Sequence, residues 1–303
     1  MPDTNKLNID VALVHSLIAA QFPEWADLTI KPVEFSGWDN RTFHLGEHMS
    51  VRLPSAEKYS AKVEIEQRWL PKFAPFLPLQ IPTPLAMGKP SAEYPWKWSV
   101  YKWLEGETAS VDRIDNISQF ATKLGDFLAT LQQIDTTGGP PAGAHNFYRG
   151  GDLATYDSQT RQSIAIMATK IDASIMTKIW NKALDSKWQQ APVWVHGDVA
   201  VGNLLVSNRQ LSAVIDFGGL GVGDPACDLV MAWTFFQGES RDAFRTAINL
   251  DANTWARARG WALWKALIVC AEQPGTNQRE NEKSWLVLNE ILADCRDLPD
   301  KPI

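Results

Sequence analysis

Residues 191–229 read APVWVHGDVAVGNLLVSNRQLSAVIDFGGLGVGDPACDL, and the predicted fold follows from this stretch. His196 and Asp198 form an H-x-D group, and Asn203 follows five positions after Asp198. Short apolar runs flank this polar loop, and a further apolar run ends directly before Asp216. Such runs are typical of short β-strands. The sequence therefore predicts a loop and a strand end that present their polar residues to one place.

The three residues Asp198, Asn203 and Asp216 suit the chemistry of phosphoryl transfer. The carboxylate of Asp198 would accept the proton of an attacking hydroxyl group. Asn203 and Asp216 offer oxygen ligands for Mg²⁺, which would hold nucleotide phosphates and neutralise developing charge. Each residue type alone is common in turns, but the joint spacing, with Asp216 at the end of an apolar run, favours the catalytic interpretation.

The segments HGDVAVGNLLV and VIDFGGLGVGDPACDL resemble the aminoglycoside phosphotransferase family, whose members are similar in fold to protein kinases. The family's usual Leu-His-Pro is replaced by Val-Ala-Val at residues 199–201, whereas Asp198 and Asn203 are kept. The resemblance implies a two-lobed, protein-kinase-like α+β fold. Its β-rich nucleotide-binding lobe would span residues 1–104. Its mainly helical lobe, with the catalytic loop and substrate site, would span residues 105–303.

The N-terminal lobe holds the candidate phosphate-binding residues. Arg52 lies on a predicted strand where a kinase fold places a Lys that contacts the α and β phosphates, and an Arg adds a two-pronged fork. A helix is predicted over residues 59–73, which prolines from residue 71 onward are expected to end. The family pattern favours Glu66 as the ion-pair partner of Arg52, with Glu64 as the alternative. In a hairpin tip, the backbone amides and the side chain of Ser36 or Asn40 are candidate phosphate donors.

The resemblance also implies a hinge at residues 102–106. There the Lys102 carbonyl and the Leu104 amide would bind the adenine edge. His196 is assigned to the catalytic loop, together with Asp198. It is expected to brace the loop through hydrogen bonds rather than to transfer protons.

Composition narrows the partners. The chain of 303 residues is 45% hydrophobic and 21% charged, as in ordinary soluble globular proteins. A net charge of −6 argues against nucleic acid or an anionic membrane as a partner. We find no membrane-length apolar stretch and no targeting pattern, so a cytoplasmic enzyme is expected. Most of the fourteen tryptophans are assigned to packing.

The expected reaction transfers the γ-phosphoryl group of ATP or GTP, with Mg²⁺, to a hydroxyl group of a small molecule. The acidic balance and the family name favour an aminoglycoside antibiotic, hence a resistance enzyme; a macrolide, or a metabolite such as choline or homoserine, is the alternative. Acids that could meet an amine-rich ligand follow the catalytic loop, although each one alone is more typical of a solvated helix charge: Asp228, Glu239, Asp242, Glu272 and Glu282. An inactive kinase-like binding module is disfavoured because every motif residue is present. Neither G-x-S-x-G nor a P-loop motif occurs, which argues against a serine hydrolase or a P-loop NTPase. Neither the oligomeric state nor the nucleotide preference follows from the sequence.

Overall fold

The structure is a computed structural model that describes residues 7–34, 39–271 and 277–296. The chain divides into two compact units, residues 1–107 with 212–218 and residues 108–211 with 219–303. The lobe boundary predicted between residues 104 and 105 stays a prediction. The return of segment 212–218 into the first unit was not anticipated, because chain order alone assigned everything after residue 104 to the helical lobe. Among the described residues, no helix combines the length and apolar character that a bilayer crossing requires.

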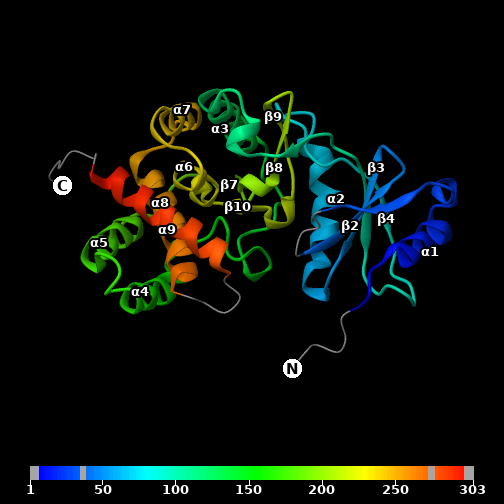
Figure 1. Ribbon diagram of the computed structural model, residues 1–303, viewed down its shortest axis with the longest axis horizontal. Coiled ribbons are helices and arrows are strands. Elements are labelled where there is room, and N and C mark those ends of the chain that lie inside the picture. The colour runs from blue at the N-terminus through cyan, green and yellow to red at the C-terminus, as the bar shows by residue number, and fades with distance from the viewer. Residues whose placement is uncertain (1–6, 35–38, 272–276, 297–303) are drawn as a thin grey trace. The chain divides into compact units, whose positions relative to one another are not determined.

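The first unit is built on a five-stranded antiparallel sheet with the order β1-β2-β3-β5-β4 (Figure 1). Its strands are β1 (Ile30–Pro32), β2 (Asn40–Leu45), β3 (Met49–Pro54), β4 (Pro84–Gly88) and β5 (Trp98–Lys102). Helix α1 (Val11–Gln21) begins at the N-cap Asp10, whose side chain accepts from the Leu13 amide. Helix α2 (Ala61–Phe73) contacts β4 and β5.

Side-chain alternation along β3 separates a core face from a polar face. Val51 and Leu53 are fully buried and share a core with Leu17 and Ile18 of α1. Arg52, between them, therefore points to the opposite face. That face is the one on which the ion pair between Arg52 and helix α2 forms.

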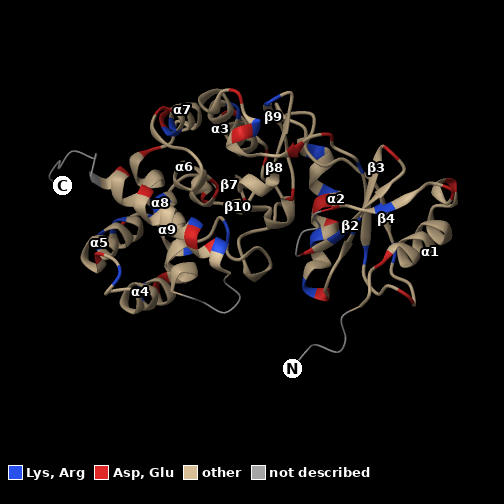
Figure 2. Cartoon of the chain, in the orientation of Figure 1, with Lys and Arg blue, Asp and Glu red and all other residues tan. Residues whose placement is uncertain are grey.

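Helix α2 begins two residues later than predicted and passes through Pro71, where a stop was expected. A proline this close to the helix end removes only one intrahelical hydrogen bond. Leu70 and Phe73 are both fully buried, so the last turn is held by packing on either side of the proline. Charged side chains of both signs lie along α2 (Figure 2).

The second unit is mainly helical (Figure 1). Its helices are α3 (Ile117–Gln133), α4 (Asp157–Ile166), α5 (Ala173–Leu184), α6 (Met231–Thr234), α7 (Gly238–Ile248), α8 (Ala252–Cys270) and α9 (Gln278–Arg296). Its short strands β7 (Val193–Val195) and β10 (Gly221–Gly223) pair antiparallel. Strands β6 (Glu107–Thr108), β8 (Leu204–Ser207) and β9 (Gln210–Val214) form a small sheet in the order β6-β8-β9, of which Glu107 and residues 212–214 are assigned to the first unit.

Three packed helix pairs organise this unit. Helix α3 packs against α7, and α8 packs against both α5 and α9. Gly125 permits the close approach of α3 to α7, since a Cβ atom there would lie 2.6 Å from the Cβ atom of Ala247. Helix α8 is buried on most of its circumference, so it forms the centre of the unit.

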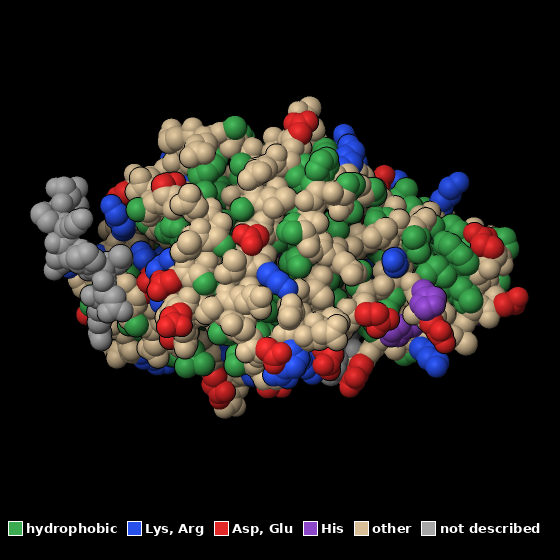
Figure 3. All heavy atoms as spheres, turned by 90° about the horizontal axis from the view of Figure 1, so that it is seen from above, with side chains coloured by type: hydrophobic (Ala, Val, Ile, Leu, Met, Phe, Trp, Pro, Cys, Tyr) green, Lys and Arg blue, Asp and Glu red, His purple; other side chains and the backbone are tan. Residues whose placement is uncertain are grey.

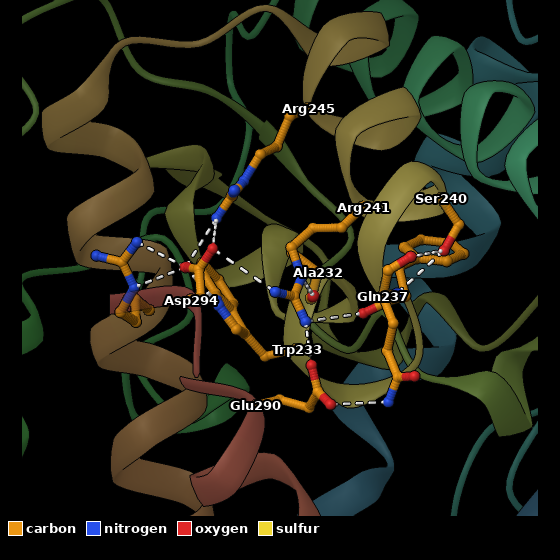
Figure 4. A network of polar contacts seen from close by, with 10 residues as sticks. Ala232, Trp233, Gln237, Ser240, Arg241, Arg245, Glu290 and Asp294 are labelled. Carbon is orange, nitrogen blue, oxygen red and sulfur yellow. Dashed lines mark hydrogen bonds and ion pairs between the residues drawn. The ribbon is translucent and has the colours of Figure 1, made fainter. Parts of the chain in front are cut away.

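Asp294 ties four helices together from α9 (Figure 4). Its carboxylate is buried and accepts hydrogen bonds from Arg245 (2.9 and 3.0 Å), Arg259 (2.8 Å) and the indole of Trp233 (3.0 Å). Arg241 lies 3.6 Å away. Burial acts to raise the pKa of Asp294, but the hydrogen bonds and charges of Arg245 and Arg259 lower it to about 2. The sequence analysis did not identify this network.

Candidate active site

Strand β7 leads into the predicted catalytic loop through a position that requires glycine. Gly197 has a φ of +81°, and a Cβ atom there would lie 2.1 Å from the carbonyl oxygen of Gly219. The buried carboxylate of Asp228 accepts hydrogen bonds from the backbone amides of His196 (2.6 Å) and Gly197 (2.8 Å). Burial raises the pKa of Asp228 above its ordinary value, although His196 and the two amides act to lower it. The loop is thus anchored from behind.

His196 and Asp198 occupy different environments although one residue separates them. His196 is fully buried, and its Nδ1 accepts a hydrogen bond from the Asp198 backbone amide at 3.2 Å. An accepting Nδ1 carries no proton, so the ring supports the loop from inside. Asp198 itself is exposed. The Asp198 carboxylate is therefore accessible to the hydroxyl group of a substrate. The buried position of His196 suits the predicted role of supporting the loop through hydrogen bonds.

Asn203 is attached to Asp198 through its amide nitrogen. Its Nδ2 donates to the backbone oxygen of Asp198 (2.9 Å) and to the carboxylate oxygen Oδ2 (3.2 Å). The 3₁₀ turn Val201–Asn203 presents the side chain at this point. Because the nitrogen is engaged, the amide oxygen Oδ1 is the atom left to accept or ligate.

In the first unit, Arg52 bridges two carboxylates. Its Nη1 lies 3.6 Å from Glu66 and its Nη2 lies 3.3 Å from Asp216. Tyr101 donates its hydroxyl hydrogen to Glu66. Burial raises the pKa of Glu66, and Arg52 opposes this increase. Burial acts to lower the pKa of Arg52, but the two carboxylates hold it above its ordinary value.

Glu66, and not Glu64, is the residue that pairs with Arg52. Glu64 is exposed and pairs with Lys97. The sequence analysis overlooked Lys62, which lies one turn before Glu66, ion-pairs with Asp39 at 2.5 Å and lines a small cavity with Arg52. The spacing of four residues from Glu66 is the signal that would have drawn attention to it.

Asp216 has a φ of +64°, in the left-handed region that residues other than glycine seldom adopt. Such a conformation costs about 1–3 kcal/mol and is concentrated at functional sites. Asp216 and Arg52 belong to the first unit, whereas Asp198 and Asn203 belong to the second.

The remaining predicted nucleotide-binding residues are placed as follows. Lys102 is the last residue of β5, and its backbone amide donates to the Thr83 carbonyl at 2.9 Å. Leu104 follows the strand, half-buried, and its backbone amide has no hydrogen bond to any described residue. That free donor suits the predicted adenine contact. Ser36 lies outside the described residues.

The acids expected to meet an amine-rich ligand are dispersed among different environments. Asp228 is engaged by the loop, and Glu272 lies outside the described residues. Glu239 and Asp242 are exposed on α7, and Glu282 is exposed on α9. On the face shown in Figure 3, acidic and basic side chains are interspersed. The charged groups nearest to Asp198 therefore indicate the charge of the ligand better than the net charge of the chain does.

Comparison with known proteins gives one family and a set of similar structures. The model of the APH phosphotransferase enzyme family matches residues 29–261. A search of curated proteins found no match.

Three solved structures illustrate the likeness of fold. The GDP and kanamycin complex of APH(2")-IIia is 16% identical over 93% of this chain and 98% of its own, with a TM-score of 0.71. The streptomycin-ATP-APH(2")-IIa ternary complex is 18% identical over 94% and 97%, with a TM-score of 0.56. The macrolide 2'-phosphotransferase MphH from Brachybacterium faecium is 21% identical over 97% and 100%, with a TM-score of 0.59. The predicted kinase-like α+β fold is thereby confirmed.

Proposed function

The chain belongs to the APH phosphotransferase enzyme family, and on this basis we propose that it transfers the γ-phosphoryl group of a nucleoside triphosphate to a hydroxyl group of a small molecule. The observation that carries the proposal is the exposed carboxylate of Asp198. His196 and Asn203 hold its backbone, and Asn203 also donates to the carboxylate. A carboxylate in this position is suited to orient a hydroxyl group and accept its proton.

The second unit supplies the acceptor side of the reaction. Asp198 takes the proton of the attacking hydroxyl group. His196 and Asn203 hold the backbone and the carboxylate of Asp198, and Asp228 holds the loop that carries them. Because these contacts fix both the loop and the carboxylate, the base needs little rearrangement to act.

The first unit supplies the nucleotide side. Arg52 would donate to the phosphates, and Glu66 positions the guanidinium. The Lys102 carbonyl and the Leu104 amide would contact the adenine edge, and Ser36 would donate to a phosphate. Complexes of similar structures contain GDP or ATP.

The donor set suits magnesium. The amide oxygen of Asn203 and the carboxylate of Asp216 are hard oxygen ligands of the kind that Mg²⁺ prefers together with phosphate oxygens. Bound there, Mg²⁺ would neutralise charge on the phosphates. Among the described residues, no group of three or more His, Cys, Asp and Glu could hold a metal by itself. Binding would therefore depend on the nucleotide.

The acceptor proposed first is an aminoglycoside, since several similar structures are aminoglycoside phosphotransferases with kanamycin or streptomycin bound. A macrolide is the second candidate, because a macrolide 2'-phosphotransferase has the same fold. Metabolites such as choline and homoserine complete the panel.

The test is nucleotide turnover with Mg²⁺ and this panel, comparing the wild type with Asp198→Asn. Turnover should fall by about 10²–10⁴-fold in the variant, the usual contribution of a general base, while nucleotide affinity stays within about twofold. Asp126→Asn, at an exposed position on α3, is the matched control and should turn over normally. Wild-type turnover in Asp198→Asn would exclude Asp198 as the base.

A further inference from the structure

The loop that precedes α4 is fixed in a strained conformation. The side chain of the fully buried Asn146 accepts from the Gly143 amide and donates to the Arg149 carbonyl, both at 3.0 Å. Phe147 and Tyr148 have φ values of 54° and 53°, and both side chains are exposed. Two successive left-handed residues other than glycine cost several kcal/mol, at about 1–3 kcal/mol each. The hydrogen bond from Asn146 and the strained turn together fix the backbone position of the next residue, Arg149.

The guanidinium of Arg149 lies against two indole rings of α8. Its Cζ is 4.9 Å from the ring centre of Trp261 and 5.3 Å from that of Trp264. Tyr156 stacks on Trp264, with 3.8 Å between the ring centres. Within the described parts of the chain, the guanidinium has no hydrogen bond and no ion pair. An arginine that lies against aromatic rings can keep its edge donors available for a carboxylate or a phosphate.

Lys265 is a second cation without a partner in the described structure. It follows Trp264 on α8 and is exposed. Desolvation by the surrounding protein lowers its pKa, and the charge of Arg149 lowers it further, whereas Asp198 and Glu280 act to raise it. Lys265 stands one helical turn after Trp261, the indole nearest to the Arg149 guanidinium, so both cations lie at this face of α8. The charge of Asp198 acts on the same lysine.

Among the described residues neither cation has a carboxylate at ion-pair distance, although Asp228 acts on Arg149 and Asp198 acts on Lys265 from farther away. An anion bound between the two cations would relieve their mutual repulsion. We propose that Arg149 and Lys265 form an oxyanion subsite next to Asp198, which binds a carboxylate or phosphate group during the reaction. The proposal rests on the proposed function in one respect, the role of Asp198 as the base. All three residues belong to the second unit.

The oxyanion has two possible sources with the same chemistry. It is either an acidic group on the acceptor molecule or the phosphoryl group in transit to the acceptor hydroxyl. The first source would make the natural acceptor a hydroxy acid or a phosphorylated alcohol, and would exclude a polycation such as an aminoglycoside. The second source leaves the acceptor class open and makes both cations stabilise the transferred group.

Binding is tested without turnover, with inorganic phosphate as the probe. Phosphate is titrated into protein labelled with ¹⁵N-tryptophan, and the indole signals of Trp261 and Trp264 are followed. The wild type should show a saturable shift. In Lys265→Met and in Arg149→Met the apparent Kd should rise at least tenfold, whereas Lys265→Arg should retain binding. Lys182→Met, at an exposed position on α5, is the matched control and should bind as the wild type does.

The outcomes separate the subsite from the reaction. An unmoved indole signal at saturating phosphate, or an unchanged Kd in Lys265→Met, overturns the subsite even if turnover is normal. Because Lys265 is exposed, that variant should fold whether or not Arg149→Met does. Phosphate binding that depends on Lys265, in a protein without turnover on any acceptor, overturns the proposed function and leaves the subsite standing.

The source of the oxyanion is decided by kinetics of Lys265→Met over the acceptor panel, extended with hydroxy acids. A loss in kcat by the same factor for every acceptor assigns the subsite to the phosphoryl group. A rise in KM confined to acidic acceptors assigns it to the acceptor. Identical kinetics of the variant and the wild type with every acceptor overturn the subsite.

Discussion

The guanidinium of Arg52 lies 3.3 Å from the carboxylate of Asp216. A residue proposed to bind phosphates is thus ion-paired with a residue proposed to bind metal, inside one compact unit. If the two residues bind as proposed, both charges exchange partners when the nucleotide and its metal bind. The affinity for the nucleotide therefore includes the free energy of separating this pair.

Replacing Arg52 by Met should weaken nucleotide binding by at least about tenfold, because a two-pronged phosphate donor is lost. The free energy of unfolding should fall by about 3 kcal/mol, since Glu66 is left buried with one partner fewer. Calorimetry with ATP and GTP, and denaturant unfolding, measure the two effects. Arg68→Met, on the exposed side of α2, is the control. Unchanged affinity in a folded Arg52→Met protein would remove Arg52 from the nucleotide site.

Glu66→Gln and Glu64→Gln form a matched pair two residues apart. Glu66→Gln should reduce kcat/KM by about tenfold or more, because Arg52 loses the charge that positions it. Glu64→Gln should stay within about twofold, since its pair with Lys97 is exposed and such pairs contribute about 0–1 kcal/mol. Steady-state kinetics of both variants would contradict the assignment if the two losses were equal.

Asp228→Asn should displace the catalytic loop while leaving its sequence intact. One carboxylate oxygen becomes an NH₂ group, which faces a backbone amide of His196 or Gly197 and cannot accept from it. The free energy of unfolding should fall by about 2–3 kcal/mol. We expect kcat to fall more than nucleotide affinity, measured by turnover and by nucleotide titration, with Asp126→Asn as the reference. Normal kcat would show that the loop does not need this anchor.

Asp294→Asn should lower the free energy of unfolding at pH 7 by about 3–5 kcal/mol, because the buried Arg259 loses its counter-charge and the buried Arg241 keeps only Glu290. A pKa of about 2, against an ordinary 3.8, makes the wild-type contribution depend on pH. That contribution, roughly 2 kcal/mol, is complete above about pH 4 and is lost as the pH falls toward 2. Denaturant unfolding from pH 7 to pH 2.5 should show the two proteins converging on the acid side. Asp242→Asn, exposed on α7, should follow the wild type at every pH.

The features that the sequence predicted are those encoded by local spacing. His196, Asp198 and Asn203 lie within eight residues of one another, so the loop pattern was visible without any tertiary information. The choice between Glu66 and Glu64 was also encoded, because Glu66 shares a helix face with the buried Val63 and Trp69. The prediction of Glu66 rested on a family pattern, although the phase of the helix alone distinguishes Glu66 from Glu64.

The features that it missed are created by tertiary contacts. Arg149 and Lys265 are separated by more than a hundred residues, and Asp294 meets arginines from two other helices. No local sequence pattern predicts contacts between residues so far apart in the chain. The prediction of acids at the ligand site relied on composition. The carboxylate of Asp228, however, accepts two backbone hydrogen bonds from the loop that it supports. Composition counts charges but does not say which of them are already neutralised.

The position of Asp294 near the end of α9 bears on how the chain can be shortened or fused. A deletion that removes this residue takes the ion-pair partner from Arg245 and from the buried Arg259, and leaves Arg241 with Glu290 alone. The last helix is therefore a part of the second unit's charge balance and not an appendage to it. A tag or fusion partner should therefore follow residue 296. In a series of progressive C-terminal deletions, the yield of soluble protein should drop abruptly once residue 294 is removed.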